Sequence, residues 1–278
     1  MVKVDFFYPR WGSEHIAWDT FLDSIQKEGY CGVEWFPFGE DTDHEEVLRL
    51  LHGRGLKYTI VTCVVEPFDH VRVYYQLLEK QLSYYGELAK KIFRPEVISV
   101  QMGREYFEVE DIVQGLHLCE RISQQYGVPV LQETHRNKWN YGLHTIPRIL
   151  KLFPGLRLTL DISHWYCVSE SYLEDRKHVL EEILPHVDHI HARVGHSQGS
   201  QVPDVRERAY RQIVDTHVAV WQKWIDLQKD RGVEQITICT EFGPPPYLIS
   251  SGNQDLDKDK QWQQNIWIKK HLEHTLIL

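Results

Sequence analysis

The sequence lacks the features that mark membrane and disulfide-rich proteins. No run of apolar residues approaches the roughly 18 that a membrane-spanning helix needs, and the first ten residues contain no apolar segment typical of a signal peptide. The 5 cysteines are odd in number and form no C-x-x-C pair, which argues against a disulfide framework and a zinc ribbon. We therefore expect a soluble, cytoplasmic protein that has no membrane partner.

Positive charge is also scarce. Lysine and arginine total 31 against 40 acidic residues, which gives a net charge of -9 with histidine neutral. Most nucleic-acid-binding proteins have a basic surface, although a local patch can oppose the net charge. We therefore expect a small-molecule partner and no nucleic acid.

Glycine-rich phosphate-binding turns and flexible linkers are missing as well. Instead, short strand-like runs alternate with helix-like segments, such as 14–28, 43–53 and 70–92, along the whole chain. The eight strand candidates are 2–7, 32–36, 57–62, 97–101, 129–133, 156–161, 187–191 and 235–241. Eight such units without a linker predict one α/β domain over 1–278, a single (β/α)8 TIM barrel. A doubly wound open sheet is the alternative, but no G-x-G-x-x-G turn supports it.

The predicted strand ends carry a distinctive set of polar residues. Strands five to eight end in Glu133, Asp161, His191 and Glu241. In a TIM barrel these ends share one face, where three adjacent carboxylates would repel one another unless a cation neutralises them. Carboxylate oxygens and one imidazole suit Mn²⁺, Mg²⁺, Co²⁺ or Zn²⁺. Each acid taken alone could instead be a solvated loop group or a helix cap.

Other residues near the strand ends could contact a substrate. His164 follows Asp161 by about one helical turn, while Arg136 and Arg193 could bind an anionic or polyhydroxylated molecule or pair with the carboxylates. Aromatic residues after the strands could cover the apolar face of a sugar, although such residues more often belong to the core: Trp11, Trp35, Trp139, Trp165 and Tyr166. His189 shares a strand face with His191 and is either a core residue or a further ligand.

Four segments, one at the end of each of strands five to eight, form a pattern: Gln132-Glu133-Thr134-His135-Arg136-Asn137, Leu160-Asp161-Ile162-Ser163-His164-Trp165, His189-Ile190-His191-Ala192-Arg193 and Thr240-Glu241-Phe242-Gly243, with Gly32-Val33-Glu34 in support. In these segments the chain resembles the xylose-isomerase-like TIM-barrel superfamily, a group of sugar isomerases and epimerases. The resemblance spans nearly the whole chain. Each segment is short, and it is their order, one per βα unit, that makes the resemblance specific.

The resemblance implies one divalent metal ion, with Mn²⁺ expected first, held by Glu133, Asp161, His191 and Glu241. It also implies that His164 contacts the substrate, that Glu241 abstracts a proton next to a carbonyl group and that Glu133 returns it. A metal that binds the carbonyl and a neighbouring hydroxyl oxygen would stabilise the enediolate formed between these steps. The implied activity is that of an isomerase or epimerase of a small sugar, sugar acid or polyol ketone. Homo-oligomeric assembly is a further habit of the superfamily.

The chain departs from relatives of known activity. The early strands lack the histidines with which abasic-site endonucleases of this superfamily hold three metals, and His191-Ala192-Arg193 replaces the D-x-D pair of xylose isomerases. Many relatives also have an aspartate shortly after the histidine of strand seven, where this chain has 194–199, VGHSQG. A dehydratase of a keto-polyol uses the same metal and base, so it remains an alternative. An abasic-site endonuclease and a non-catalytic sugar-binding barrel are weaker ones.

Overall fold

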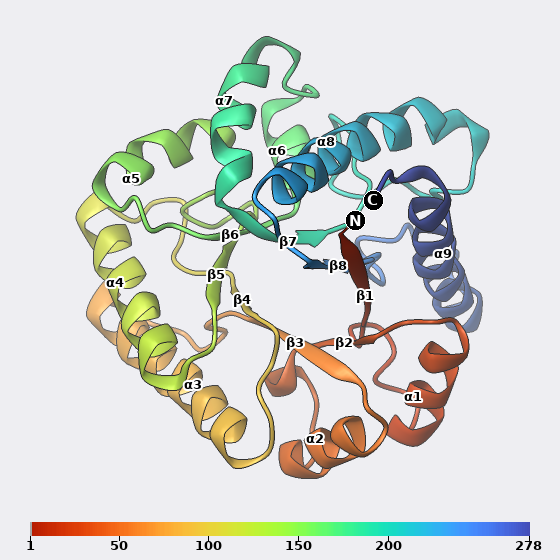
Figure 1. The fold of residues 1–278 in the computed structure, drawn as a ribbon, viewed down its shortest axis with the longest axis horizontal. Coiled ribbons are helices and arrows are strands. Elements are labelled where there is room, and N and C mark those ends of the chain that lie inside the picture. Colours follow the sequence, from red (N-terminus) through yellow and green to blue (C-terminus); the bar gives the residue numbers. More distant parts are fainter. Residues whose placement is uncertain (1) are drawn as a thin grey trace.

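The computed structural model describes residues 2–278 and confirms the single (β/α)8 barrel. Eight parallel strands close into a ring in chain order, and β1 pairs with β8, so the open-sheet alternative is wrong. Figure 1 shows the ring from one end, with the helices outside it. The strands are β1 (Lys3–Pro9), β2 (Gly32–Trp35), β3 (Lys57–Thr62), β4 (Ile98–Val100), β5 (Val130–Glu133), β6 (Leu158–Leu160), β7 (Val187–His191) and β8 (Gln235–Cys239).

Helices follow every strand and cover the outside of the barrel. They are α1 (Trp18–Lys27), α2 (His44–Gly53), α3 (Val71–Lys91), α4 (Val109–Tyr126), α5 (Ile146–Leu152), α6 (Ile162–Ser169), α7 (Lys177–Ile183), α8 (Arg211–Asp230) and α9 (Gln254–Thr275). Within residues 2–278, no helix combines the length and the hydrophobicity that crossing a bilayer requires.

Local sequence signals set several of the boundaries. The Asp43 side chain accepts hydrogen bonds from the first backbone N–H groups of α2, and Gly127, with φ of 66°, ends α4. The predicted strand over 235–241 is two residues too long, because the backbone leaves the sheet after Cys239 and reaches a positive φ of 31° at Glu241. That turn places Glu241 at the mouth of the barrel.

The core has an apolar outer layer and a partly polar interior. Apolar residues of the helices pack against the outside of the sheet, as in other barrels. Inside, the register sets Glu34 of β2 beside Thr59 and His189 of β7 beside Thr237, and all four are buried. Buried polar groups are costly unless they are hydrogen-bonded, so this interior must form a network. All five cysteines are free thiols.

Candidate metal centre and active site

The four predicted ligands lie at the carboxyl ends of four consecutive strands. Glu133 and His191 are the last residues of β5 and β7, Asp161 directly follows β6, and Glu241 lies two residues after β8. All four are buried, and Glu241 has the largest exposed fraction, 5%. Parallel strands therefore bring together residues that are up to 108 positions apart, from Glu133 to Glu241.

Three of these residues form a compact group around His191. Nδ1 of His191 lies 2.7 Å from Oε2 of Glu241 and 3.8 Å from Oε1 of Glu133. One ligand atom from each of the three residues falls within 4.8 Å of the others. Oε1 of Glu133 also accepts a hydrogen bond of 2.9 Å from Nε2 of Gln101, which orients its carboxylate.

Asp161 has a different environment. Its Oδ1 accepts a 3.0 Å hydrogen bond from the backbone N–H of Ser163, so it caps α6. Its Oδ2 lies 3.0 Å from Nε of Arg193, whose Nη2 lies 2.9 Å from Oε2 of Glu241. The guanidinium of Arg193, which is itself buried, thus bridges the carboxylates of Asp161 and Glu241.

The protonation equilibria of the two glutamates are pushed apart. Burial raises the pKa of Glu133 to about 8, with Glu241 and other carboxylates adding to the rise and His191 opposing it. Burial also acts to raise the pKa of Glu241, but Arg193 and His191 outweigh it and hold that pKa below its ordinary value. Glu241 therefore favours the carboxylate and Glu133 the protonated acid.

The pKa of His191 is raised well above its ordinary value. Burial alone would lower it, but the carboxylates of Glu241, Glu34 and Glu133 outweigh burial. This position is therefore one where positive charge is favoured, and a bound cation satisfies the same demand as a proton.

The donor set fits a divalent cation. Oε2 of Glu133, Nδ1 of His191 and Oε2 of Glu241 have no hydrogen-bond partner among the described residues, and the 2.7 Å contact between the last two lacks hydrogen-bond geometry. Unpartnered buried polar atoms are rare, and two carboxylate oxygens with one imidazole nitrogen are ligands that Zn²⁺, Mn²⁺ and Co²⁺ accept. Glu133, His191 and Glu241 could hold such an ion, with Asp161 beside them.

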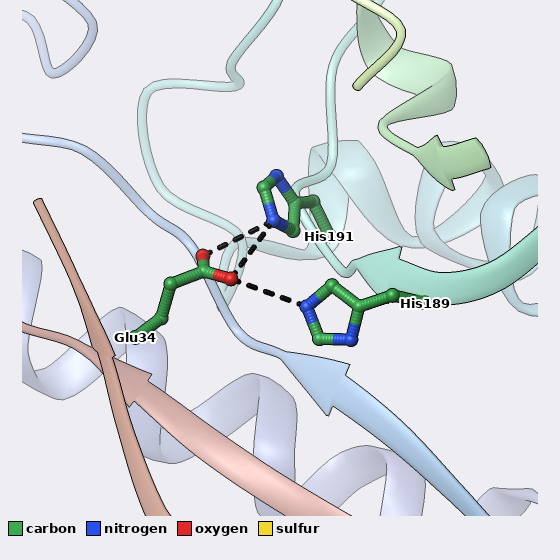
Figure 2. Close-up of side chains that lie close together, drawn as sticks. All are labelled: Glu34, His189 and His191. Carbon is green, nitrogen blue, oxygen red and sulfur yellow. Dashed lines mark hydrogen bonds and ion pairs between the residues drawn. The ribbon is translucent and has the colours of Figure 1, made fainter. Parts of the chain in front are cut away.

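A second layer of polar residues lies deeper in the barrel. Figure 2 shows Glu34 of β2 facing His189 and His191 of β7. Glu34 is buried, and its pKa lies well below the ordinary value, because the two histidines outweigh the effect of burial. From the sequence, Glu34 supports only the resemblance to the superfamily. Its position at the end of a strand was the signal that could have placed it in the site.

A cavity of about 260 Å³ opens at this end of the barrel. Its lining includes Glu34, Gln101, Arg193 and Glu241, so it reaches the metal-ligand group. Aromatic side chains make up much of the remaining wall: Trp11, Trp35, Phe36 and Tyr247. The volume is slightly below the usual range for small-molecule sites, roughly 300 to 1,000 Å³, so the cavity suits a small substrate.

Of the predicted substrate contacts, His164 lies beside the carboxylate of Asp161 and Arg136 lies beside His164, but neither lines the cavity. Nη1 of Arg136 lies 3.0 Å from Nδ1 of His164, and Nε2 of His164 lies 3.5 Å from Oδ2 of Asp161. Burial holds the pKa of His164 well below its ordinary value, so the imidazole is neutral. Because Arg136 can only donate, Nδ1 of His164 accepts and Nε2 carries the proton toward Asp161.

Trp165, a predicted substrate contact, lies away from the cavity. It is fully buried in the hydrophobic core, where its Nε1 donates a 2.9 Å hydrogen bond to the carbonyl oxygen of Asn140, and it does not line the cavity. Adjacent helical residues point about 100° apart, so α6 turns Trp165 away from the side that His164 takes. Of the five aromatic residues considered from the sequence, only Trp11 and Trp35 line the cavity.

Glu241 occupies a strained backbone conformation. Its φ of 31° is rare for a residue with a side chain, and such strain is typical of functional sites. The following turn is also crowded, because a Cβ atom at Gly243 would meet the Trp11 ring at 2.3 Å. The chain thus holds Glu241 between His191 and Arg193 at a conformational cost.

Comparison with known proteins gives a likeness of fold. No family model and no curated protein sequence matches the chain. Among solved structures, the IolI protein with a bound zinc atom has a TM-score of 0.64 at 14% identity, covering 97% of each chain. An L-ribulose 3-epimerase has a TM-score of 0.61 at 11% identity, covering 99% of this chain and 95% of its own. The probable 3-DHS dehydratase AsbF from Bacillus anthracis has a TM-score of 0.59 at 17% identity, covering 94% of this chain and 98% of its own.

Proposed function

We propose that this chain, which has the fold of the xylose isomerase-like TIM-barrel proteins, is a divalent-metal-dependent isomerase or epimerase of a small sugar, sugar acid or polyol ketone. The observation that carries the proposal is the buried group of Glu133, His191 and Glu241 at the carboxyl end of the barrel. Glu241 belongs both to this group and to the cavity wall, so a substrate in the cavity would meet it. Active sites of TIM barrels lie at this end.

Glu133, His191 and Glu241 would hold the ion, with Asp161 as the fourth ligand. When bound, a divalent cation would stabilise negative charge that develops on substrate oxygens. The zinc atom of the IolI structure and the magnesium of a barrel from Mycobacterium smegmatis support a divalent ion. Mn²⁺ remains the ion that we would test first.

The acid and base roles follow from the environments of the two glutamates. Glu241 is the base, because Arg193 and His191 keep it ionised and it lines the cavity. Glu133 is the group that returns the proton, because burial favours its protonated form. A pair of carboxyl groups whose pKa values are pushed apart is a recurring arrangement in acid–base catalysis. Arg193 orients Glu241. His164 and Arg136 are the further polar contacts that we propose for the substrate, although neither is among the residues that line the cavity.

The charges of the cavity wall favour an uncharged, polyhydroxylated substrate. Among the described residues that line the cavity, the cation Arg10 pairs with Glu40 at 2.6 Å and Arg193 pairs with Glu241 at 2.9 Å. Four glutamates against two arginines leave no excess positive charge for a phosphate group. The aromatic wall suits the apolar face of a sugar.

The proposal is tested with Glu241→Gln, which removes the base and preserves its volume. We expect turnover of a responsive sugar to fall by about 10² to 10⁴-fold, because that is the usual contribution of a general base. The assay screens ketoses and their epimers with Mn²⁺ and follows deuterium uptake from D₂O at the carbon next to the carbonyl. Near-normal turnover in the variant would refute the role of Glu241. Loss of water from the substrate instead of epimerisation would identify the dehydratase.

A further inference from the structure

We propose that Glu34 is a positioning residue, which holds His191 with its Nε2–H turned toward β2 and thereby leaves Nδ1 as the nitrogen that binds the metal ion. This inference rests on the metal centre proposed above. It adds Glu34, which lies 157 positions before His191 on a strand that does not pair with β7, to the residues that form the metal centre. Glu34 itself is not a ligand in this arrangement.

The contacts of the Glu34 carboxylate support this role. Nε2 of His191 lies 3.1 Å from each of its two oxygens, so the ring edge points at the carboxylate. Its Oε2 also accepts a hydrogen bond of 3.1 Å from the Thr59 hydroxyl. The same oxygen lies 3.2 Å from Nε2 of His189 (Figure 2). A carboxylate only accepts, so each histidine must place a proton on Nε2.

His189 helps to hold the Glu34 carboxylate in place. Its Nδ1 lies 2.7 Å from the Thr237 hydroxyl and its Nε2 faces Glu34, so both ring nitrogens have partners. Glu34 is thus held by the threonine of β3, which the register of the sheet sets beside it, and by the histidine of β7, which reaches it across the interior of the barrel. A carboxylate fixed in this way fixes the imidazole that donates to it.

The hydrogen bond from Nε2 to Glu34 determines the state of Nδ1, at the other edge of the His191 ring. Because Nε2 donates to Glu34, the lone pair of the neutral ring lies on Nδ1, which faces Glu133 and Glu241. A histidine ligand whose second nitrogen donates to a carboxylate is a more basic and better oriented ligand. Without Glu34 the ring could rotate or change tautomer, and the ion would lose part of its site.

A competing arrangement uses the same three residues. Ligand atoms of Glu34, His189 and His191 also lie within 4.8 Å of one another and could hold a cation themselves. The hydrogen bonds favour the positioning role, because Nε2 of both histidines is already paired with Oε2 of Glu34, and of the atoms that face one another in this group only Oε1 of Glu34 lacks a hydrogen-bond partner among the described residues. In that competing arrangement the ion would bind Nε2 of His191, and this difference is measurable.

The test measures metal affinity and the state of His191. Co²⁺ and Zn²⁺ are titrated calorimetrically into the wild type, Glu34→Gln, Glu34→Asp and the control Thr59→Val, which removes one hydrogen bond from the same carboxylate. We expect the dissociation constant to rise about 10 to 100-fold in Glu34→Gln, the usual effect of losing an outer partner of a ligand, with partial recovery in Glu34→Asp and a rise below about threefold in Thr59→Val. In ¹⁵N-histidine spectra of the zinc-loaded wild type, His191 should show a protonated Nε2 and a metal-bound Nδ1.

The outcomes separate this inference from the proposed function. Unchanged affinity in a folded Glu34→Gln, or zinc bound to Nε2 of His191, would overturn the positioning role while leaving a metal-dependent enzyme in place. Absence of Co²⁺ and Zn²⁺ binding in the wild type would overturn both. If Glu34→Gln does not fold, the spectrum of the wild type still decides which nitrogen holds the ion.

Discussion

The buried guanidinium of Arg193 allows a quantitative test of the electrostatics of the site. Arg193→Met keeps much of the side-chain volume but removes the charge that bridges Asp161 and Glu241 at 3.0 and 2.9 Å. Breaking a buried ion pair costs about 3 to 5 kcal/mol, because the remaining carboxylate is left uncompensated. With an unfolding entropy of about 2.1 cal/mol/K per residue, this cost corresponds to a fall in Tm of roughly 5 to 9 °C for the whole chain.

The matched control is Arg206→Met. Nη2 of Arg206 lies 2.7 Å from Oδ2 of Asp204, but 39% of the arginine side chain is exposed. Solvent screens such a pair, so the expected cost is below about 1 kcal/mol. Both variants are unfolded by heat and by urea in the presence of a chelator. The difference between their losses in free energy of unfolding, each relative to the wild type, isolates the effect of burial.

The free energy of unfolding that Arg193→Met loses should depend on pH, and the direction of this dependence can be predicted. In the wild type, burial acts to raise the pKa of Glu241, but Arg193 is the largest of the effects that lower it, and the pKa lies below 4.5. The ionised carboxylate therefore stabilises the fold above about pH 4.5, and this stabilisation disappears as the pH falls through the pKa of the folded state. Without Arg193 the folded pKa of Glu241 rises. The difference between wild type and variant should therefore be largest at neutral pH and shrink toward pH 4.5.

A divalent cation should restore part of this stability. An ion at one hundred times its dissociation constant stabilises the folded state by about 2.7 kcal/mol. We expect Mn²⁺ or Zn²⁺ to raise the Tm of Arg193→Met at least as much as that of the wild type, because the ion neutralises the same carboxylates. The reasoning would be refuted if Arg193→Met lost no more free energy of unfolding than Arg206→Met, or if its loss grew as the pH fell.

Three further variants test individual residues. Trp165→Phe should lower the free energy of unfolding by about 1 to 3 kcal/mol, since the carbonyl group of Asn140 loses its buried donor, and it should leave KM nearly unchanged. A tenfold rise in KM would return Trp165 to the substrate site. Asp161→Asn should still cap α6 through its amide oxygen. Both Asp161→Asn and Glu133→Gln should purify without the single equivalent of metal that we expect for the wild type. A full equivalent of metal in Asp161→Asn, measured by elemental analysis, would remove Asp161 from the ligand set.

The number and order of the strands and the placement of the strand-end residues could be predicted from the sequence. Strand and helix signals are local, so eight alternating units are readable without any contact between them. Once the units close into a barrel, the ends of parallel strands must share a face, and Glu133, His191 and Glu241 therefore meet. This step needs only residue positions, not side-chain conformations.

Only the tertiary structure decided which atoms face one another. The contact between Glu34 and His191 joins two strands that are not neighbours in the barrel, and nothing local to β2 or β7 specifies it. The bridge that Arg193 forms between Asp161 and Glu241 depends on the rotamer of a long side chain, and the burial of Trp165 depends on how α6 is rotated. These features arise from closing and packing the barrel. Such non-local contacts have no periodic signature in the chain, which is why the meeting of the strand-end residues was predictable and the network around them was not.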